Sequence, residues 1–216
     1  MDVGKSFSYV FQDQNWLVKI LIGGILSLIP ILNLAVWGYW IEAMRNVAQG
    51  RDLPLPEWGE DFGGKLIKGI VIFVIFLIYS IPLILVYGCL VVVSAGAGDQ
   101  EDAQALAALI SLPLVCILFI YGLLLGIFSP AIFIQYATTG QLSSAFAFGR
   151  LFQLIGQNLG NYILAIVLGW VAGFIAFFGI IACFVGLFFT AFWAQLVTAH
   201  LYGQVARGSA PVPAAA

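Results

Sequence analysis

The stretch of sequence that decides the fold class is LIKGIVIFVIFLIYSIPLILVYGCLVVV, residues 66–93. Its one charged residue is Lys68, near the start, and Pro82 is placed to kink a helix near the middle. A helix of these 28 residues extends about 42 Å, which exceeds the roughly 30 Å hydrocarbon core of a bilayer. The stretch therefore predicts a membrane-spanning helix.

The composition of the whole chain agrees with this interpretation. Of its 216 residues, 62% are hydrophobic and 8% are charged, whereas soluble domains average about 45–50% apolar and about 25% charged residues. So few charges cannot cover a soluble domain of this size. The net charge of −2 also offers no basic surface for a nucleic acid. We predict an integral membrane protein that contacts the lipid bilayer and has no nucleic-acid partner.

Three further spans follow from apolar runs. Residues 105–136 form a second long run, with a proline near each end. Residues 159–205 are long enough for two more spans, and we place the break between them near 178–182. The predicted spans are thus 66–93, 105–136, 159–178 and 183–205.

Residues 16–44 leave two alternatives. This apolar segment is broken by Gly23-Gly24, Pro30 and Asn33. One straight helix of this length would extend about 43 Å, whereas two spans need about 40 residues and a turn. The segment either crosses once, giving five spans, or forms a re-entrant hairpin that turns near 30–33.

The distribution of basic residues favours the hairpin. With a hairpin, all eight Lys and Arg residues lie on one side of the membrane, while a single crossing divides them six against two. Basic residues concentrate in cytoplasmic loops. We therefore predict an all-α transmembrane bundle of four spans plus an N-terminal re-entrant hairpin. The 45–65 loop and the C-terminus are expected in the cytoplasm, with the chain multi-pass in the inner (plasma) membrane.

Two shorter segments have the periodicity of amphipathic helices. Residues 2–15 and 148–157 each place apolar side chains on one helical face and polar ones on the other, which is typical of helices in the membrane interface. For residues 2–15, a frayed terminus that packs against the protein's own loops fits equally well. We expect one integral-membrane domain, residues 1–207, and a flexible Pro/Ala tail, residues 208–216.

The last span carries the one organised set of polar residues. Gln195, Thr198 and Tyr202 are spaced at i, i+3 and i+7, with His200 nearby. Such residues commonly hydrogen-bond between helices in membranes. The alternative is a polar cavity for a ligand.

Small residues and one loop supply the other candidates. Gly122/Gly126 and Gly169/Gly173 are small-xxx-small pairs that allow two helices to approach closely, within the chain or between chains. In the 45–65 loop, Trp58, Asp61 and Phe62 form either an interfacial anchor or a docking site for a partner.

Local ion pairs are also predicted at the edges of this loop. Glu42 and Arg45 are spaced at i and i+3, and Asp61 and Lys65 at i and i+4. On a helix, oppositely charged residues at these spacings lie next to each other. We expect both pairs to have a structural role.

The sequence gives no sign of catalysis. It contains no G-x-S-x-G and no phosphate-cradling loop, and no catalytic, cofactor-binding or metal-binding residue is assigned. The spans carry none of the buried charges typical of ion-coupled pumps. We expect a non-enzymatic structural or accessory subunit without a cofactor, forming a homo-oligomer or joining other membrane proteins. The alternative is a passive channel or a small-solute or lipid transporter.

The chain resembles the bacterial and archaeal membrane family called domain of unknown function 4013. The resemblance covers roughly residues 5–205 and implies a prokaryotic membrane protein of the topology given above. It implies no activity and no catalytic residue. The residues that carry it are Asp13, Trp16, Lys19, Gly23-Gly24, Pro30, Gly38-Tyr39, Arg45, Gly50, Leu55-Pro56, Trp58, Asp61, Tyr79, Pro82, Tyr136, Ala145-Phe146 and Asn158.

Overall fold

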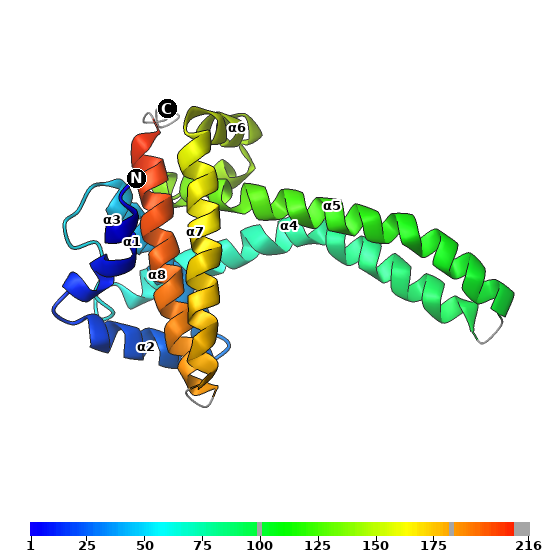
Figure 1. Cartoon of the computed structure of the whole chain (residues 1–216), viewed down its shortest axis with the longest axis horizontal. Helices are drawn as coiled ribbons and strands as arrows, with labels where there is room; N and C mark the ends of the chain where they lie inside the picture. The colour runs from blue at the N-terminus through cyan, green and yellow to red at the C-terminus, as the bar shows by residue number, and fades with distance from the viewer. Residues whose placement is uncertain (99–100, 182–183, 210–216) are drawn as a thin grey trace. The chain divides into compact units, whose positions relative to one another are not determined.

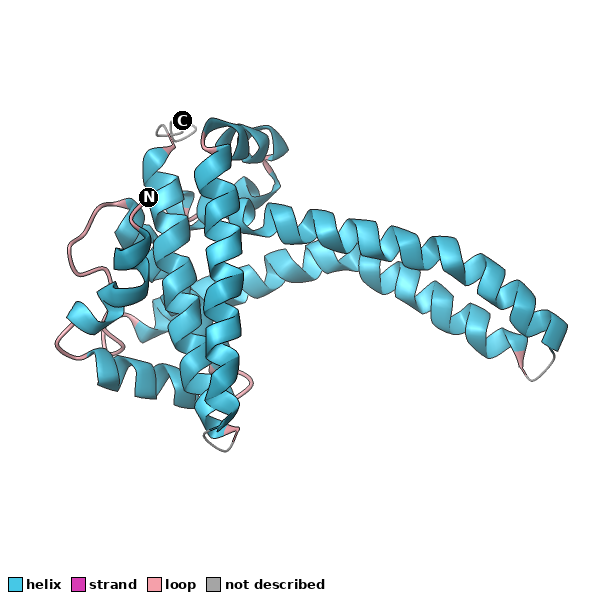
Figure 2. Cartoon of the chain, in the orientation of Figure 1, coloured by secondary structure: helices cyan, strands magenta, loops and turns pink. Residues whose placement is uncertain are grey.

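A computed structural model describes residues 1–98, 101–181 and 184–209. Within these ranges every regular element is helical (Figures 1 and 2). Most of the predicted Pro/Ala tail, residues 210–216, lies outside the described residues. The prediction of an all-α fold is confirmed.

Among the described residues, four helices are long and apolar enough to cross a membrane, as predicted. They are α4 (Phe62–Ala97), α5 (Glu101–Thr139), α7 (Leu159–Phe177) and α8 (Val185–Gly208). Helices α4, α5 and α8 run beyond at least one of the ends expected from the sequence, because each helix continues past its apolar run, whereas α7 stays within its predicted bounds.

Residues 16–44 turn back on themselves, as the hairpin prediction requires. Helix α2 (Trp16–Leu28) ends at Ile29, which is extended with φ −102° and ψ 115°, because proline at the next position disfavours helical geometry. Helix α3 (Asn33–Ala48) follows after the turn. With 13 and 16 residues, the two helices extend about 20 and 24 Å. Neither is long enough to cross the roughly 30 Å hydrocarbon core alone.

The chain divides into two compact units, residues 1–73 with 130–216 and residues 74–129. In the first unit α8 is the helix on which the others assemble. Helices α1 (Val3–Ser8), α2, α3 and α7 all pack against it, and α7 and α8 run side by side (Figure 1). The core of the first unit therefore lies along α8.

Adjacent glycines explain how α2 reaches α8. An added Cβ at Gly23 would lie 2.3 Å from the ring of Phe192, and one at Gly24 would lie 2.2 Å from the ring of Phe189. Real Cβ atoms do not come this close to another atom. The glycine pair thus provides the space in which two phenylalanine rings of α8 pack.

The α3 and α4 backbones touch at two further glycines. A Cβ at Gly38 would lie 1.7 Å from the carbonyl oxygen of Lys65, and a Cβ at Gly69 would lie 1.7 Å from that of Leu34. The two contacts are reciprocal, since each helix contributes one glycine and one carbonyl. Sequence analysis named Gly38 only among the residues that carry the family resemblance, and it did not name Gly69.

The second unit consists of the α4 and α5 segments between residues 74 and 129. The Tyr121 hydroxyl of α5 donates a hydrogen bond to the Tyr79 carbonyl of α4 at 2.9 Å. Among the described side chains of this unit, Ile75 alone is buried. Every other described side chain of the two helix segments is therefore exposed or half-buried.

The two amphipathic segments are helical. At the N-terminus, α1 continues into the 3-10 helix η1 (Tyr9–Gln12), where Tyr9 and Val10 are buried. This segment packs against helix α8, whereas the second alternative had placed it against loops. A position in the membrane interface stays a prediction.

Helix α6 (Phe148–Gln157) buries Leu151 and Leu154 and leaves Phe152 exposed. Two more 3-10 helices, η2 (Leu142–Phe146) and η3 (Phe178–Ile181), precede α6 and follow α7. The second unit contains neither of them.

Gly38→Ala tests the α3–α4 contact. The new methyl group would overlap the Lys65 carbonyl, so the helices must move apart, and overpacking of this kind costs about 1–3 kcal/mol. Gly88→Ala is the control, because Gly88 lies in α4, the other helix of this contact, and its Cβ would meet nothing within 4 Å. We expect a lower midpoint of thermal unfolding in detergent for Gly38→Ala alone. Equal midpoints would contradict the contact.

Candidate functional site

The polar residues of α8 lie against neighbouring helices. Thr198 Oγ1 accepts a hydrogen bond from Trp40 Nε1 of α3 at 3.1 Å and donates one to the Gln195 carbonyl at 2.7 Å. The Tyr202 ring meets the Trp40 ring edge to face, with 6.4 Å between centroids. The Gln195 Oε1 atom is buried without a hydrogen-bond partner among the described residues. Thr198 and Tyr202 thus join α8 to α3.

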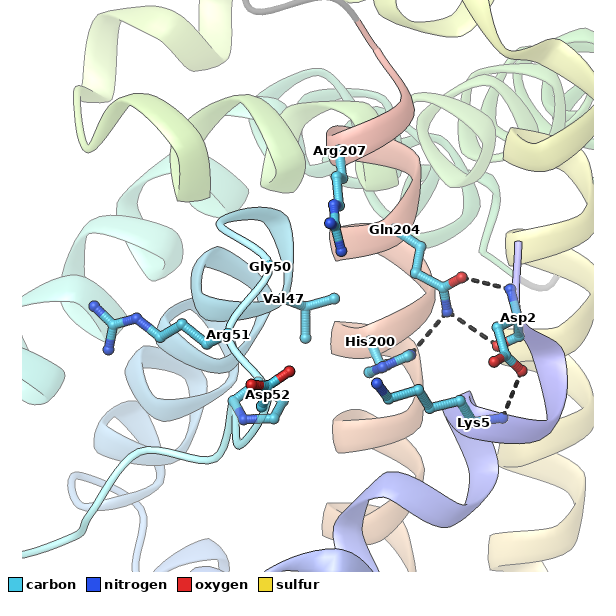
Figure 3. Close-up of a pocket in the computed structure, with 10 residues that line it drawn as sticks. Asp2, Lys5, Val47, Gly50, Arg51, Asp52, His200, Gln204 and Arg207 are labelled. Carbon is cyan, nitrogen blue, oxygen red and sulfur yellow. Dashed lines mark hydrogen bonds between the residues drawn. The ribbon is translucent and has the colours of Figure 1, made fainter.

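His200 belongs to a hydrogen-bond network with the N-terminus (Figure 3). Its Nδ1 lies 2.9 Å from Ser6 Oγ and 2.8 Å from Gln204 Nε2. The Gln204 side chain also accepts a hydrogen bond from the Asp2 N–H at 2.6 Å and donates one to the Asp2 carbonyl at 3.1 Å. Burial raises the pKa of Tyr9, whose ring lies 4.5 Å from that of His200. The network fixes the N-terminus on α8.

A cavity of about 320 Å³ lies beside this network, and we call it the N-terminal cavity (Figure 3). Lys5, Arg51 and Arg207 line it with positive charge, and Asp2 and Asp52 with negative charge. The charges nearly balance, as expected for a polar contact region between three segments of the chain.

The turn after α3 places Arg51 and receives Arg207. Gly50 has a φ of +77°, a conformation that favours glycine, and an added Cβ there would lie 3.2 Å from the Arg207 Cζ. In Figure 3 the Arg207 side chain points toward Gly50, whereas the Arg51 side chain points away from His200. Gly50 is therefore needed both for the turn and for the space that the guanidinium occupies.

Arg51 also lines a second cavity, of about 430 Å³, which we call the arginine cavity. Helix α3 contributes Glu42 and Arg45, and α4 contributes Lys68. The C-terminal end of α5 supplies Tyr136. With three positive groups and one negative group, this cavity carries the larger charge imbalance of the two.

Glu42 pairs across helices and not along its own. Its Oε2 lies 3.2 Å from Lys68 Nζ and 3.6 Å from Lys65 Nζ, whose side chain is fully buried. Lys65 Nζ also donates to the Glu60 carbonyl. The predicted Glu42–Arg45 pair is wrong, because α4 lies within reach of the Glu42 carboxylate and supplies both of its lysine partners.

The segment after the turn is held by side chains that bind its backbone. Three successive carbonyls, those of residues 54–56, accept hydrogen bonds from the hairpin. Asn46 Nδ2 donates to the carbonyl of residue 54 at 2.9 Å, and Lys19 Nζ donates to that of residue 55 at 3.4 Å. Tyr39 OH donates to the carbonyl of residue 56 at 2.8 Å. This segment is therefore fixed by donors from α2 and α3.

Lys19 is the charged centre of this arrangement. Its side chain is 3% exposed and its Nζ lies 2.7 Å from Asp13 and 2.6 Å from Glu57. The Lys19 carbonyl accepts a hydrogen bond from Trp58 Nε1 at 3.0 Å. Two carboxylates thus neutralise a lysine that would otherwise be buried with its charge uncompensated.

Trp58 is not the surface anchor or docking residue that the sequence predicted. It is 7% exposed and stacks on the Tyr39 ring with 4.3 Å between centroids. Asp61 caps α4 instead of pairing with Lys65, since its Oδ1 accepts a hydrogen bond from the Gly64 N–H at 3.0 Å. Asp61 is exposed and Phe62 half-buried, so for these two a docking role stays a prediction.

The four predicted glycines divide into two groups. A Cβ at Gly169 would lie 3.2 Å from Thr198 Cγ2, so this glycine seats α7 against α8. At Gly122, Gly126 and Gly173 a Cβ would meet nothing within 4 Å. The last three therefore bring no helices of this chain together.

The arginine cavity and the Lys19 ion pairs were not recognised from the sequence. The concentration of basic residues on one predicted side was the available signal, since Arg45, Arg51 and Lys68 all belong to that set. Their convergence on one cavity depends on how α3, α4 and α5 pack.

These features define the class as an all-α polytopic membrane protein with an N-terminal helical hairpin held by buried charges. The family model described as "Protein of unknown function (DUF4013)" matches residues 22–185, about three quarters of the chain. The chain belongs to this family, which confirms the resemblance predicted from the sequence. Searches among curated proteins and among solved structures returned no match.

Asp13→Asn tests the buried ion pair against Glu57→Gln as a matched control. The Asp13 side chain is 10% exposed and that of Glu57 is 51% exposed, and both lie on the same lysine. Loss of a buried partner costs up to about 3–5 kcal/mol, whereas loss of an exposed one costs about 0–1 kcal/mol. Circular dichroism during heating in detergent should show the larger loss of stability for Asp13→Asn. A larger loss for Glu57→Gln would contradict the assignment.

Proposed function

We propose that this chain is a non-enzymatic accessory subunit of a membrane assembly, either a homo-oligomer or a complex with other membrane proteins. The observation that carries the proposal is the second unit, in which Ile75 alone is buried among the described side chains of residues 74–129. Two long helix segments with so little internal packing leave their surfaces free for lipid or for another chain.

The length of α5 supports a protein partner in addition to lipid. Its stretch between Gln104 and Gln135, residues 105–134, carries no charge and extends about 45 Å as a helix. A typical tilt of about 20° lengthens the path through the roughly 30 Å core only to about 32 Å. Apolar side chains beyond that length are removed from water if another protein covers them.

The exposed glycines of α5 fit this role. Gly122 and Gly126 are four residues apart and face no other part of the described chain within 4 Å. Van der Waals packing of small residues drives helix association in lipid, where apolar exposure alone does not. A second helix could therefore approach α5 closely at this pair.

The passive channel or transporter alternative has less support. It was suggested by the polar residues of α8, and two of these are engaged within the chain. Thr198 is hydrogen-bonded to Trp40, and His200 to the N-terminal network.

Mass determination of the full chain in nanodiscs tests the accessory role. We expect a mass above that of one chain, or a protein that copurifies at a fixed ratio. Gly122→Leu combined with Gly126→Leu should lower the associated fraction at least severalfold, because the larger side chains keep a partner helix away. Gly149→Leu is the control, since Gly149 lies in α6 with open space around it. A monomer without a copurifying protein would contradict the proposal.

Cysteine labelling tests the proposed topology in the inner (plasma) membrane. Gly59→Cys, in the loop between α3 and α4, should react only from the cytoplasmic side, because the basic residues flanking this loop are retained there. Gln104→Cys, near the start of α5, should react only from the opposite side. Both positions are exposed. Labelling of both from one side would rule out the four-span arrangement.

A further inference from the structure

We propose that the arginine cavity is a binding site for a phosphate group, as carried by the headgroup of an anionic phospholipid. The inference goes beyond the accessory role and does not depend on it. Three properties of the cavity support it: its charges, the chemistry of its two arginines and its position along α4 and α5.

The charges of the cavity are not compensated within the chain. Its one carboxylate, Glu42, is already shared between Lys68 at 3.2 Å and Lys65 at 3.6 Å. The guanidinium groups of Arg45 and Arg51 have no carboxylate within ion-pair distance in the described ranges. Two full positive charges on one cavity therefore remain without a counter-charge.

The helix C-terminus offsets only part of this charge. Arg45 lies in the last turn of α3, where the helix dipole contributes roughly half a negative charge. Arg51 follows the turn at Gly50, and its backbone N–H donates to the Asn46 carbonyl at 3.1 Å. The turn thus fixes the backbone of Arg51 on the same cavity wall as Arg45.

The chemistry of two arginines suits a phosphate group. The planar guanidinium presents N–H groups in a fork that matches two phosphate oxygens, and Lys68 adds a point charge. Both arginines are exposed, so a ligand can reach them from outside the protein. The cavity volume of about 430 Å³ leaves space for a headgroup beyond the phosphate itself.

The position of the cavity along α4 and α5 points to the membrane surface. Lys68 is the last charged residue before the apolar run of α4, and Tyr136 comes at the end of the apolar run of α5. Basic cavities at this level, between transmembrane helices on the cytoplasmic side, are where anionic headgroups bind. Tyrosine is also enriched at membrane–water boundaries.

Native mass spectrometry of the detergent-solubilised full chain tests the site with two lipids and one free ion. We expect phosphatidylglycerol to remain bound, and phosphatidylcholine to bind about tenfold or more weakly. Inorganic phosphate at millimolar concentration distinguishes a site for free phosphate from a site for a lipid headgroup. If it raises the unfolding midpoint and phosphatidylglycerol binds no better than phosphatidylcholine, the site takes free phosphate and the headgroup assignment is wrong.

Charge-matched variants locate the binding. Arg45→Gln with Arg51→Gln should weaken phosphatidylglycerol binding about tenfold or more, whereas Lys5→Gln with Arg150→Gln removes the same charge elsewhere and should leave it unchanged. Equal weakening in both double variants would show general charge attraction and overturn the site. If a double variant does not fold, the same binding measurement is made on Arg51→Gln alone. The wild-type chain also tests the proposal: equal binding of the two lipids and no change of the unfolding midpoint with phosphate would overturn it.

Discussion

Three consecutive backbone carbonyls, at residues 54–56, have to find donors in a part of the molecule where water is largely excluded. Asn46, Lys19 and Tyr39 provide them, and an unpaired buried carbonyl would cost about 1–3 kcal/mol. Because these donors come from both helices of the hairpin, the segment after the turn closes over α2 and α3. Trp58 is then placed against Tyr39.

Satisfying those carbonyls determines how the buried charges are arranged. Lys19 can enter the interior because it gains two carboxylates as well as a carbonyl. Lys65 and Glu42 form the equivalent buried contact between α4 and α3. With these charges used for packing, Arg45 and Arg51 face the arginine cavity without a carboxylate partner among the described residues. The structural charges and the candidate binding charges are thus separate sets.

Much of the fold could be predicted from residue order alone. Apolar run length predicts four spans because the bilayer sets a minimum helix length, and Pro30 predicts the hairpin turn because it forces the preceding residue to be extended. The contacts between segments could not be predicted. Helical spacing suggested a Glu42–Arg45 pair, but the approach of α4 decides otherwise, and the burial of Trp58 depends on residues far from it in sequence. Gly38 and Gly69 carry no local signal, since their importance lies in what faces them.

The central place of α8 has a consequence for how the protein is made. The ribosome produces α8 after every other described helix, yet α1, α2 and α3 all pack against it. While the chain is still being elongated, the hairpin stands in the membrane with the space at Gly23 and Gly24 unfilled. The rings of Phe192 and Phe189 close that space only after α8 has been made. A chain cut short before α8 would keep the space open and leave the α2 face at these two glycines uncovered.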